Sequence, residues 1–254
     1  MRLNPGEKVM FIGCEILFRE ACLLAARSPL QVDIAFQHKG LHDLPTAQMR
    51  SILQQAIDGA AATGQYRAVL LGYARCNDGV VGLRAPSIPL VIPKGHDCIT
   101  LFFGSRRKYQ DYFDAHPGTY FHTTGWVERN DPDVPGQRGV MEQLGLNVTF
   151  GELVAKYGQE NARYVLETLG DWKRNYRHLC YIRMGVADEQ AFIDASRDQA
   201  AAQNWQFDLC DGDLSLLERL LGGLWDDDLL VIPPGGSITA RNDAEVLGCD
   251  ERQE

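Results

Sequence analysis

Short apolar runs alternate with longer amphipathic segments along most of this chain. In the first half of the chain, five apolar runs are as short as typical buried strands. They are residues 8–14, 32–37, 68–74, 89–93 and 119–124. Between them, segments such as 16–28, 46–64 and 98–118 have the apolar spacing of helices. This alternation implies right-handed crossovers and a parallel sheet covered by helices on both faces. We therefore expect an α/β protein with a three-layer, Rossmann-like architecture.

A segment rich in Asp, Pro, Gly and Asn interrupts the alternation at 127–148. A helical pattern at 150–176 follows it, and strand and helix patterns then alternate again. We expect two lobes with the site at the carboxyl edge of the strands. The predicted divisions are an α/β lobe at 1–126, a linker or excursion at 127–148, a second α/β lobe at 149–240 and a polar tail at 241–254. Whether the halves form two sheets or one long sheet stays open.

The net charge and the N-terminal sequence argue against a nucleic-acid-binding protein and a secreted protein. A formal net charge of −9 argues against a nucleic-acid-binding surface, which normally needs a basic field. No apolar stretch reaches the ~20 residues that cross a bilayer, and Pro5, Gly6 and Glu7 interrupt any secretory pattern. We expect a cytoplasmic protein whose seven cysteines are reduced thiols or metal ligands.

Three cysteines follow successive predicted strands. Cys14 closes the first strand, Cys76 lies just after the third, and Cys98 follows the fourth in the segment His96-Asp97-Cys98. Ligands of open parallel sheets bind beyond the carboxyl ends of the strands, where these loops meet. The sequence therefore predicts that the three thiols share one rim of the sheet with His96.

Three thiols and a histidine allow several kinds of site. Cys14, Cys76, Cys98 and His96 could ligate zinc, and the three thiolates alone could hold a [4Fe–4S] cluster with one free iron. A metal-free enzyme is also open, with Cys98 as nucleophile and His96 as base. The predicted helix that begins at Cys98 would lower the pKa of its thiol. Plain packing of buried cysteines is the remaining alternative.

Other polar side chains fall near the same rim. Asp97 could orient His96 or cap the following helix, so His96 and Asp97 are the candidates for catalysis. His42 lies in the loop after the second strand and could reach the rim. Arg106, in the following helix, could clamp a carboxylate or phosphate, although a solvated cationic face is the alternative.

Several segments resemble a family of archaeal and bacterial proteins of unknown function, domain-of-unknown-function family 1638. They are CEIL, GLHDLP, LGYARCNDGVVGL, PLVIPKGHDCITLFFGSRRKY, PGTYFHTTGW and VIPPGG, and they run through almost the whole chain. Ala74 stands where the family usually has glycine, which would stiffen the turn before Cys76. The resemblance implies that one site contains Cys14, His42, Cys76, His96, Asp97, Cys98, Ser105, Arg106, Gly118 and Trp126.

The resemblance also suggests a chemical context. Family members look associated with corrinoid-dependent methyl transfer, so a corrinoid-system protein is an expected partner and one-carbon metabolism an expected setting. The His96-x-Cys98 step is similar to the zinc-ligand step of cobamide-dependent thiol methyltransferases, which are barrel proteins. We expect a metal-binding enzyme or accessory protein acting on a small molecule. A two-lobed protein that binds an anion or corrinoid without catalysis, and a metal-free cysteine enzyme, are the alternatives.

Overall fold

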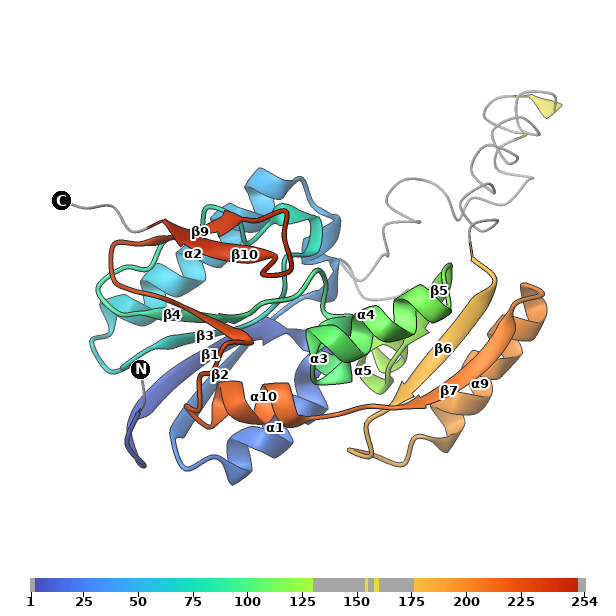
Figure 1. Ribbon diagram of the computed structural model, residues 1–254, viewed down its shortest axis with the longest axis horizontal. Coiled ribbons are helices and arrows are strands. Elements are labelled where there is room, and N and C mark those ends of the chain that lie inside the picture. The colour runs from blue at the N-terminus through green and yellow to red at the C-terminus, as the bar shows by residue number, and fades with distance from the viewer. Residues whose placement is uncertain (1–2, 130–153, 155–157, 160–175, 251–254) are drawn as a thin grey trace.

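The computed structural model describes residues 3–129, 154, 158–159 and 176–250 (Figure 1). The expected linker at 127–148 and the predicted helix at 150–176 therefore lie almost entirely outside the described residues. The rest is a mixed α/β structure with mostly parallel strands, which confirms the predicted class at this level. None of the described helices is both long enough and apolar enough to cross a membrane.

A five-stranded sheet carries the first half of the chain. Its strand order is β2-β1-β3-β4-β8. The strands are β1 (Lys8–Cys14), β2 (Gln31–Gln37), β3 (Val69–Gly72), β4 (Leu90–Pro93) and β8 (Leu229–Ile232). The first four run parallel, and β8 pairs antiparallel with β4. The carboxyl ends of β1 to β4 consequently lie along one edge of the sheet.

Helices cover both sides of this sheet. The helix α2 (Thr46–Ala62) lies on one side, while α1 (Phe18–Arg27) and α10 (Ser215–Leu221) pack together on the other (Figure 1). The hairpin of β9 (Ser237–Ala240) and β10 (Leu247–Asp250) bonds through its backbone to the loop around Gly82 and Arg84. Residues 247–250, which were expected in a polar tail, are thus a strand of this hairpin.

A second sheet contains three parallel strands in the order β5-β6-β7. They are β5 (Thr119–His122), β6 (His178–Arg183) and β7 (Gln206–Asp211), and α9 (Gln190–Ala202) packs against the last two. The expectation grouped β5 with the four preceding strands, but it pairs with β6. The later strand β8 returns to the first sheet. The described strands thus form two larger sheets besides the β9–β10 hairpin, and both β5 and β8 pair with strands from the other side of the expected boundary at 127–148.

Short helices connect these strands. The single helix expected at 98–118 is broken into α3 (Ile99–Phe103) and α4 (Arg106–Ala115), because Gly104 takes φ +70°. The Ser105 hydroxyl then accepts a hydrogen bond of 3.3 Å from the Lys108 backbone and caps α4. The other short helices of the described residues are α5 (Thr124–Glu128) and the 3₁₀ helices η1 (Glu15–Leu17), η2 (Lys39–Asp43) and η3 (Cys76–Asp78).

One aromatic ring, that of Phe11, fills the core beneath the carboxyl edge of the first sheet. Phe11 is fully buried, and Gly13 and Gly72 are register partners on β1 and β3. A Cβ atom on Gly13 would lie 2.4 Å from the Phe11 ring, and one on Gly72 would lie 2.3 Å from it. The two glycines therefore make room for the ring directly below the loops that carry Cys14 and Cys76.

Candidate functional site

A cavity of about 720 Å³ lies where loops of the first sheet meet β5 of the second. This volume is in the range of small-molecule sites. The first sheet supplies Cys14, His42, Cys76 and Cys98, which follow β1, β2, β3 and β4 respectively. Aromatic side chains also line it, among them Tyr120, Phe121, Trp126 and Tyr176. The cavity therefore combines thiols with a large apolar surface.

Backbone hydrogen bonds fix the loops that carry Cys76 and Cys98. The Arg75 nitrogen donates to the Gly95 carbonyl at 2.9 Å, and the Cys76 nitrogen donates to the His96 carbonyl at 3.1 Å. The loops after β3 and β4 thus stay hydrogen-bonded to each other for two residues beyond the sheet. This pairing places the two cysteines beside each other although 22 residues separate them.

Asn77 ties the same loops to the one after β2. Its side-chain amide donates to the backbone carbonyls of His42 and Leu44, the second at 3.3 Å. Its side-chain oxygen accepts from the Gly79 nitrogen at 3.1 Å, and its backbone takes φ +31°. Positive φ is costly for most residues and best tolerated by asparagine among those with side chains. The Asn77 contacts therefore hold a strained turn directly after Cys76.

Cys76 and Cys98 are not equivalent thiols. Hydrogen bonding from the Cys98 side chain lowers the pKa of Cys76, and this outweighs the opposing effects of burial and of the Asp97 charge. The Cys98 backbone and the charge of His42 lower the pKa of Cys76 further. The same hydrogen bond, with burial, raises the pKa of Cys98. The thiolate is therefore favoured at Cys76 and disfavoured at Cys98, where helix activation was expected.

His42 supplies positive charge to this wall. Its Nε2 lies 2.8 Å from Oδ1 of Asp43, whose side chain is almost completely buried. Burial lowers the pKa of His42, but the hydrogen bond and charge of Asp43, the charge of Cys76 and the Lys39 backbone together raise it. An imidazolium stabilises a neighbouring thiolate. His42 therefore belongs to the thiol site, through the partner Asp43 that sequence reasoning missed.

Cys14 occupies the same wall in a different state. Its side chain is buried against the first sheet, and burial raises the pKa of its thiol to about 12. At neutral pH it is a protonated, weakly polar group. It lines the cavity as a small apolar side chain.

Asp97 serves the local structure. One of its oxygens accepts from the Ile99 nitrogen at 3.0 Å, at the start of α3, and the other accepts from the Tyr109 hydroxyl at 2.7 Å. Burial raises the pKa of this carboxyl. Of the two expected roles, helix capping matches these contacts. Tyr109 lines both the large cavity and a smaller one of about 370 Å³, so the Asp97–Tyr109 pair stands between them.

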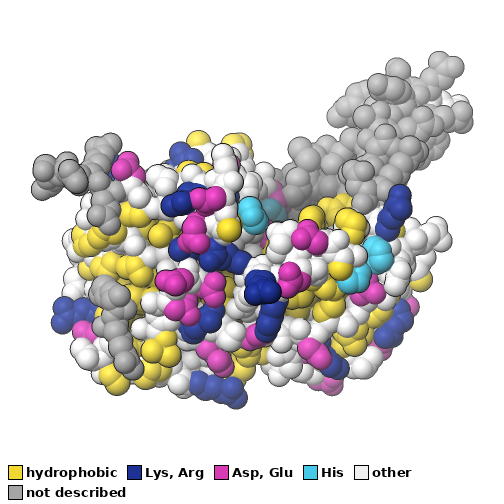
Figure 2. All heavy atoms as spheres, viewed as in Figure 1, with side chains coloured by type: hydrophobic (Ala, Val, Ile, Leu, Met, Phe, Trp, Pro, Cys, Tyr) yellow, Lys and Arg dark blue, Asp and Glu magenta, His cyan; other side chains and the backbone are white. Residues whose placement is uncertain are grey.

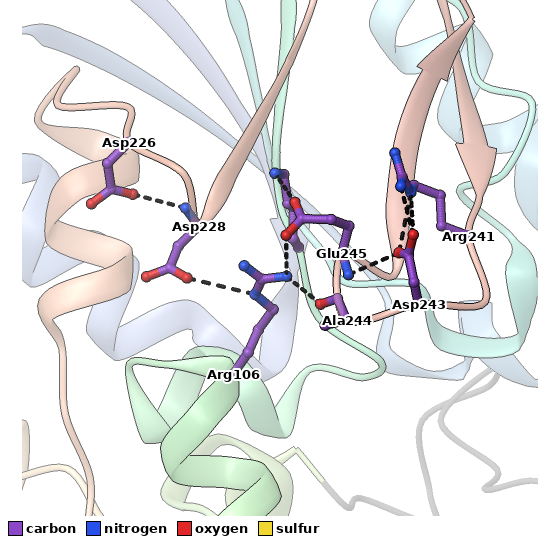
Figure 3. A network of polar contacts seen from close by, with 8 residues as sticks. Arg106, Asp226, Asp228, Arg241, Asp243, Ala244 and Glu245 are labelled. Atoms are coloured by element: carbon purple, nitrogen blue, oxygen red, sulfur yellow. Dashed lines mark hydrogen bonds and ion pairs between the residues drawn. The ribbon is translucent and has the colours of Figure 1, made fainter.

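His96, Ser105 and Arg106 line the smaller cavity. Arg106 lies between Asp228 and Glu245, with nitrogen–oxygen distances of 3.5 Å to each, and it also donates to the Ala244 carbonyl (Figure 3). Basic and acidic side chains alternate over this face of the molecule (Figure 2). The guanidinium expected to clamp an anion therefore has carboxylate partners from the chain itself.

The set of residues implied to form one site divides between two cavities. The large cavity contains Cys14, His42, Cys76, Asp97, Cys98, Gly118 and Trp126, and the smaller one contains His96, Ser105 and Arg106. His96 is thus separated from the thiols that it was expected to join as a zinc ligand. In the described part of the chain, no three His, Cys, Asp or Glu side chains are grouped to hold a metal ion. The residues therefore do not fit the expected Cys₃His site.

Arg106→Ala is expected to lower the free energy of unfolding by about 1 kcal/mol, since partly exposed ion pairs contribute little individually. The rate of alkylation of Cys76 should stay unchanged, because Arg106 lines the other cavity. Urea unfolding and thiol labelling measure the two effects. Arg107→Ala, which removes a largely exposed neighbour, is the matched control. A large change in Cys76 reactivity in Arg106→Ala would show that the cavities are coupled.

Comparison with known proteins gives one match. The model of a family described as "Protein of unknown function (DUF1638)" matches residues 36–221. No curated protein and no solved structure matches the chain. The matched range includes His42, Cys76 and Cys98 and begins after Cys14.

Proposed function

The chain belongs to the DUF1638 family, and we propose that this member binds a small, mostly apolar organic molecule and brings an electrophilic carbon of it to the Cys76 sulfur. The observation that carries the proposal is the Cys76–Cys98 pair on the wall of a ligand-sized cavity. A thiolate is the nucleophilic form of cysteine, and Cys98 and His42 both favour it at Cys76.

The proposed step is a nucleophilic displacement. The Cys76 thiolate forms a new sulfur–carbon bond, and the leaving group departs with the electron pair of the broken bond. The charge of His42, whose pKa Asp43 raises, stabilises the thiolate before the displacement. Cys76 becomes a neutral thioether and the leaving group carries away the negative charge, so charge and atoms balance. The hydrogen-bond donor Cys98 keeps its proton.

The family resemblance suggests a narrower form of this proposal. If the electrophilic carbon is a methyl group, Cys76 is a methyl acceptor and a corrinoid-system protein is the partner. We further propose that the first sheet and its helices form a three-layer, Rossmann-like lobe and that the second sheet belongs to a second lobe. The substrate would then bind between them. All seven cysteines are free thiols, which suits a reducing cytoplasmic compartment.

Binding without catalysis is the second candidate function. The aromatic residues that line the cavity favour it, because Tyr120, Phe121 and Trp126 provide an apolar surface for a planar ligand. Such a protein would retain a ligand without forming a bond to Cys76. The two functions differ in whether a covalent adduct forms.

Monobromobimane, a small apolar alkyl bromide, is expected to label Cys76 in a fast phase that Cys76→Ser abolishes. The labelling rate should exceed that of the half-buried Cys22 by about ten-fold or more, since rate follows the thiolate fraction. Stopped-flow fluorescence measures the rates, and peptide mass spectrometry identifies the modified residues.

Cys22→Ser is the matched control and should keep the fast phase. Labelling of the Cys76 peptide no faster than labelling of the Cys22 peptide would overturn the nucleophile assignment. Saturable bimane binding with no adduct at Cys76 would establish the binding-only function instead.

A further inference from the structure

A second pair of cysteines lies in the three-stranded sheet. Cys180 is on β6 and Cys210 is on β7, two parallel strands in which Ile182 is the register partner of Cys210. The Cys180 thiol donates a hydrogen bond to the Cys210 sulfur at a sulfur–sulfur distance of 3.0 Å. A shift of about 1 Å would bring the atoms to disulfide bonding distance. Neither cysteine lines the large cavity.

We infer that Cys180 and Cys210 form a redox-active dithiol that closes to a disulfide by exchange with a low-molecular-weight disulfide. The inference rests on the contact between the sulfurs and on their unequal accessibility. Cys180 is completely buried, whereas Cys210 is only partly buried and lies on the last strand of the sheet. An external disulfide therefore reaches Cys210 first, and Cys180 is the resolving thiol.

The helix α4 provides the polar surroundings of the pair. The Tyr112 side chain faces both sulfurs, and the His116 ring stacks on Tyr112 with a centroid distance of 4.4 Å. Hydrogen bonding from Cys180 lowers the pKa of Cys210 to about 7 against the effect of burial, and Tyr112 and His116 lower it further. These contacts favour the thiolate at the more accessible position.

The exchange proceeds in two balanced steps. The Cys210 thiolate attacks one sulfur of the external disulfide, forms a mixed disulfide and releases one thiolate. Cys180 then loses its proton to solvent and attacks the Cys210 sulfur, which releases the second thiolate and forms the Cys180–Cys210 bond. The protein loses two electrons, and the external disulfide gains them.

The test uses the full-length protein in mixtures of reduced and oxidised glutathione at pH 8. After acid quenching and alkylation with N-ethylmaleimide, mass spectrometry of non-reduced peptides identifies the disulfides. A Cys180–Cys210 cross-linked peptide should increase with the share of oxidised glutathione. Cys180→Ser should instead accumulate one glutathione on Cys210, and Cys210→Ser should leave Cys180 as a free thiol. Cys22→Ser should behave as wild type.

The disulfide content of the wild-type protein tests the inference even if a variant fails to fold. Free thiols at both positions across all glutathione ratios would overturn it. So would a glutathione adduct on Cys180 in place of Cys210 among the folded variants. An intact Cys180–Cys210 disulfide in Cys76→Ser would show that this site works independently of the proposed thiol chemistry in the cavity.

Discussion

Replacing Glu20 by glutamine is expected to raise the free energy of unfolding by about 3 kcal/mol at pH 9 and to change it little at pH 4. Glu20 lies on α1 and is completely buried. Neither of its carboxyl oxygens has a hydrogen-bond partner among the described residues. Burial raises the pKa of Glu20 to about 7, and the charges of Glu189 and Glu128 act in the same direction. The folded state therefore prefers the neutral acid.

The direction of the pH dependence follows from proton binding. Between the unfolded pKa near 4.5 and the folded pKa of about 7, the native state holds a proton that the unfolded state has lost. Stability should fall as pH rises through this interval and stay constant above it. Glutamine stays neutral and avoids the loss. Urea unfolding at pH 4 and pH 9 measures the effect, and Glu218→Gln on the exposed side of α10 is the control. An equal effect of Glu20→Gln at both pH values would contradict the account.

Phe11→Ala is expected to lower the free energy of unfolding by about 3–5 kcal/mol, which is the usual cost of deleting a buried aromatic ring. The cavity left behind should stay open, because Gly13 and Gly72 have no side chains to fill it. Leu224→Ala, at a side chain that is 53% exposed, should cost less than about 1 kcal/mol.

Chemical denaturation at neutral pH compares the two variants. Phe11→Ala should also slow the labelling of Cys76, because the ring supports the strand ends below the thiol loops. Similar losses of stability in Phe11→Ala and Leu224→Ala would show that the ring does not support this edge. An unchanged labelling rate of Cys76 in Phe11→Ala would show that the ring stabilises the core without positioning the thiol loops.

Local patterns predicted much of the first sheet. The apolar runs at 8–14 and 89–93 closely match β1 and β4, and the helix predicted at 46–64 is α2. Such elements are recognisable because the apolar spacing within each segment reflects its own burial. The placement of Cys14, Cys76 and Cys98 after successive strands follows from the same local information, and the structure brings all three to one cavity.

Contacts between distant segments could not be predicted in this way. β5 has the same apolar character as the strands before it, but its partner is β6, more than 50 residues later. Strand character does not identify the pairing partner, so Tyr120, Phe121 and Tyr176 were not predicted to line the cavity, while Trp126 was implied by the family resemblance alone. His96 and Cys98 are only two residues apart, yet their side chains line different cavities. Sequence spacing outside a regular strand or helix does not fix the direction of a side chain.

The roles of the two thiols also depended on three-dimensional detail. A helix beginning at Cys98 suggested a thiolate there. In the structure, the interaction between the two thiols lowers the pKa of Cys76 and raises that of Cys98, and α3 is only five residues long. The pairing of the loops through Arg75 and Gly95 creates this contact. No pattern in the sequence indicates which thiol donates.

The pH dependence of iodoacetamide alkylation at Cys76 and Cys98 distinguishes which of the two thiols is the reactive thiolate. Initial rates are resolved by peptide mass spectrometry in wild type and in His42→Gln. The account predicts that Cys76 reacts first, with a midpoint below the ordinary thiol pKa of 9.0, and that the midpoint of Cys98 is higher. His42→Gln should raise the Cys76 midpoint. Faster alkylation of Cys98, or equal midpoints near 9.0 for both thiols, would contradict the assignment of Cys76 as the reactive thiolate.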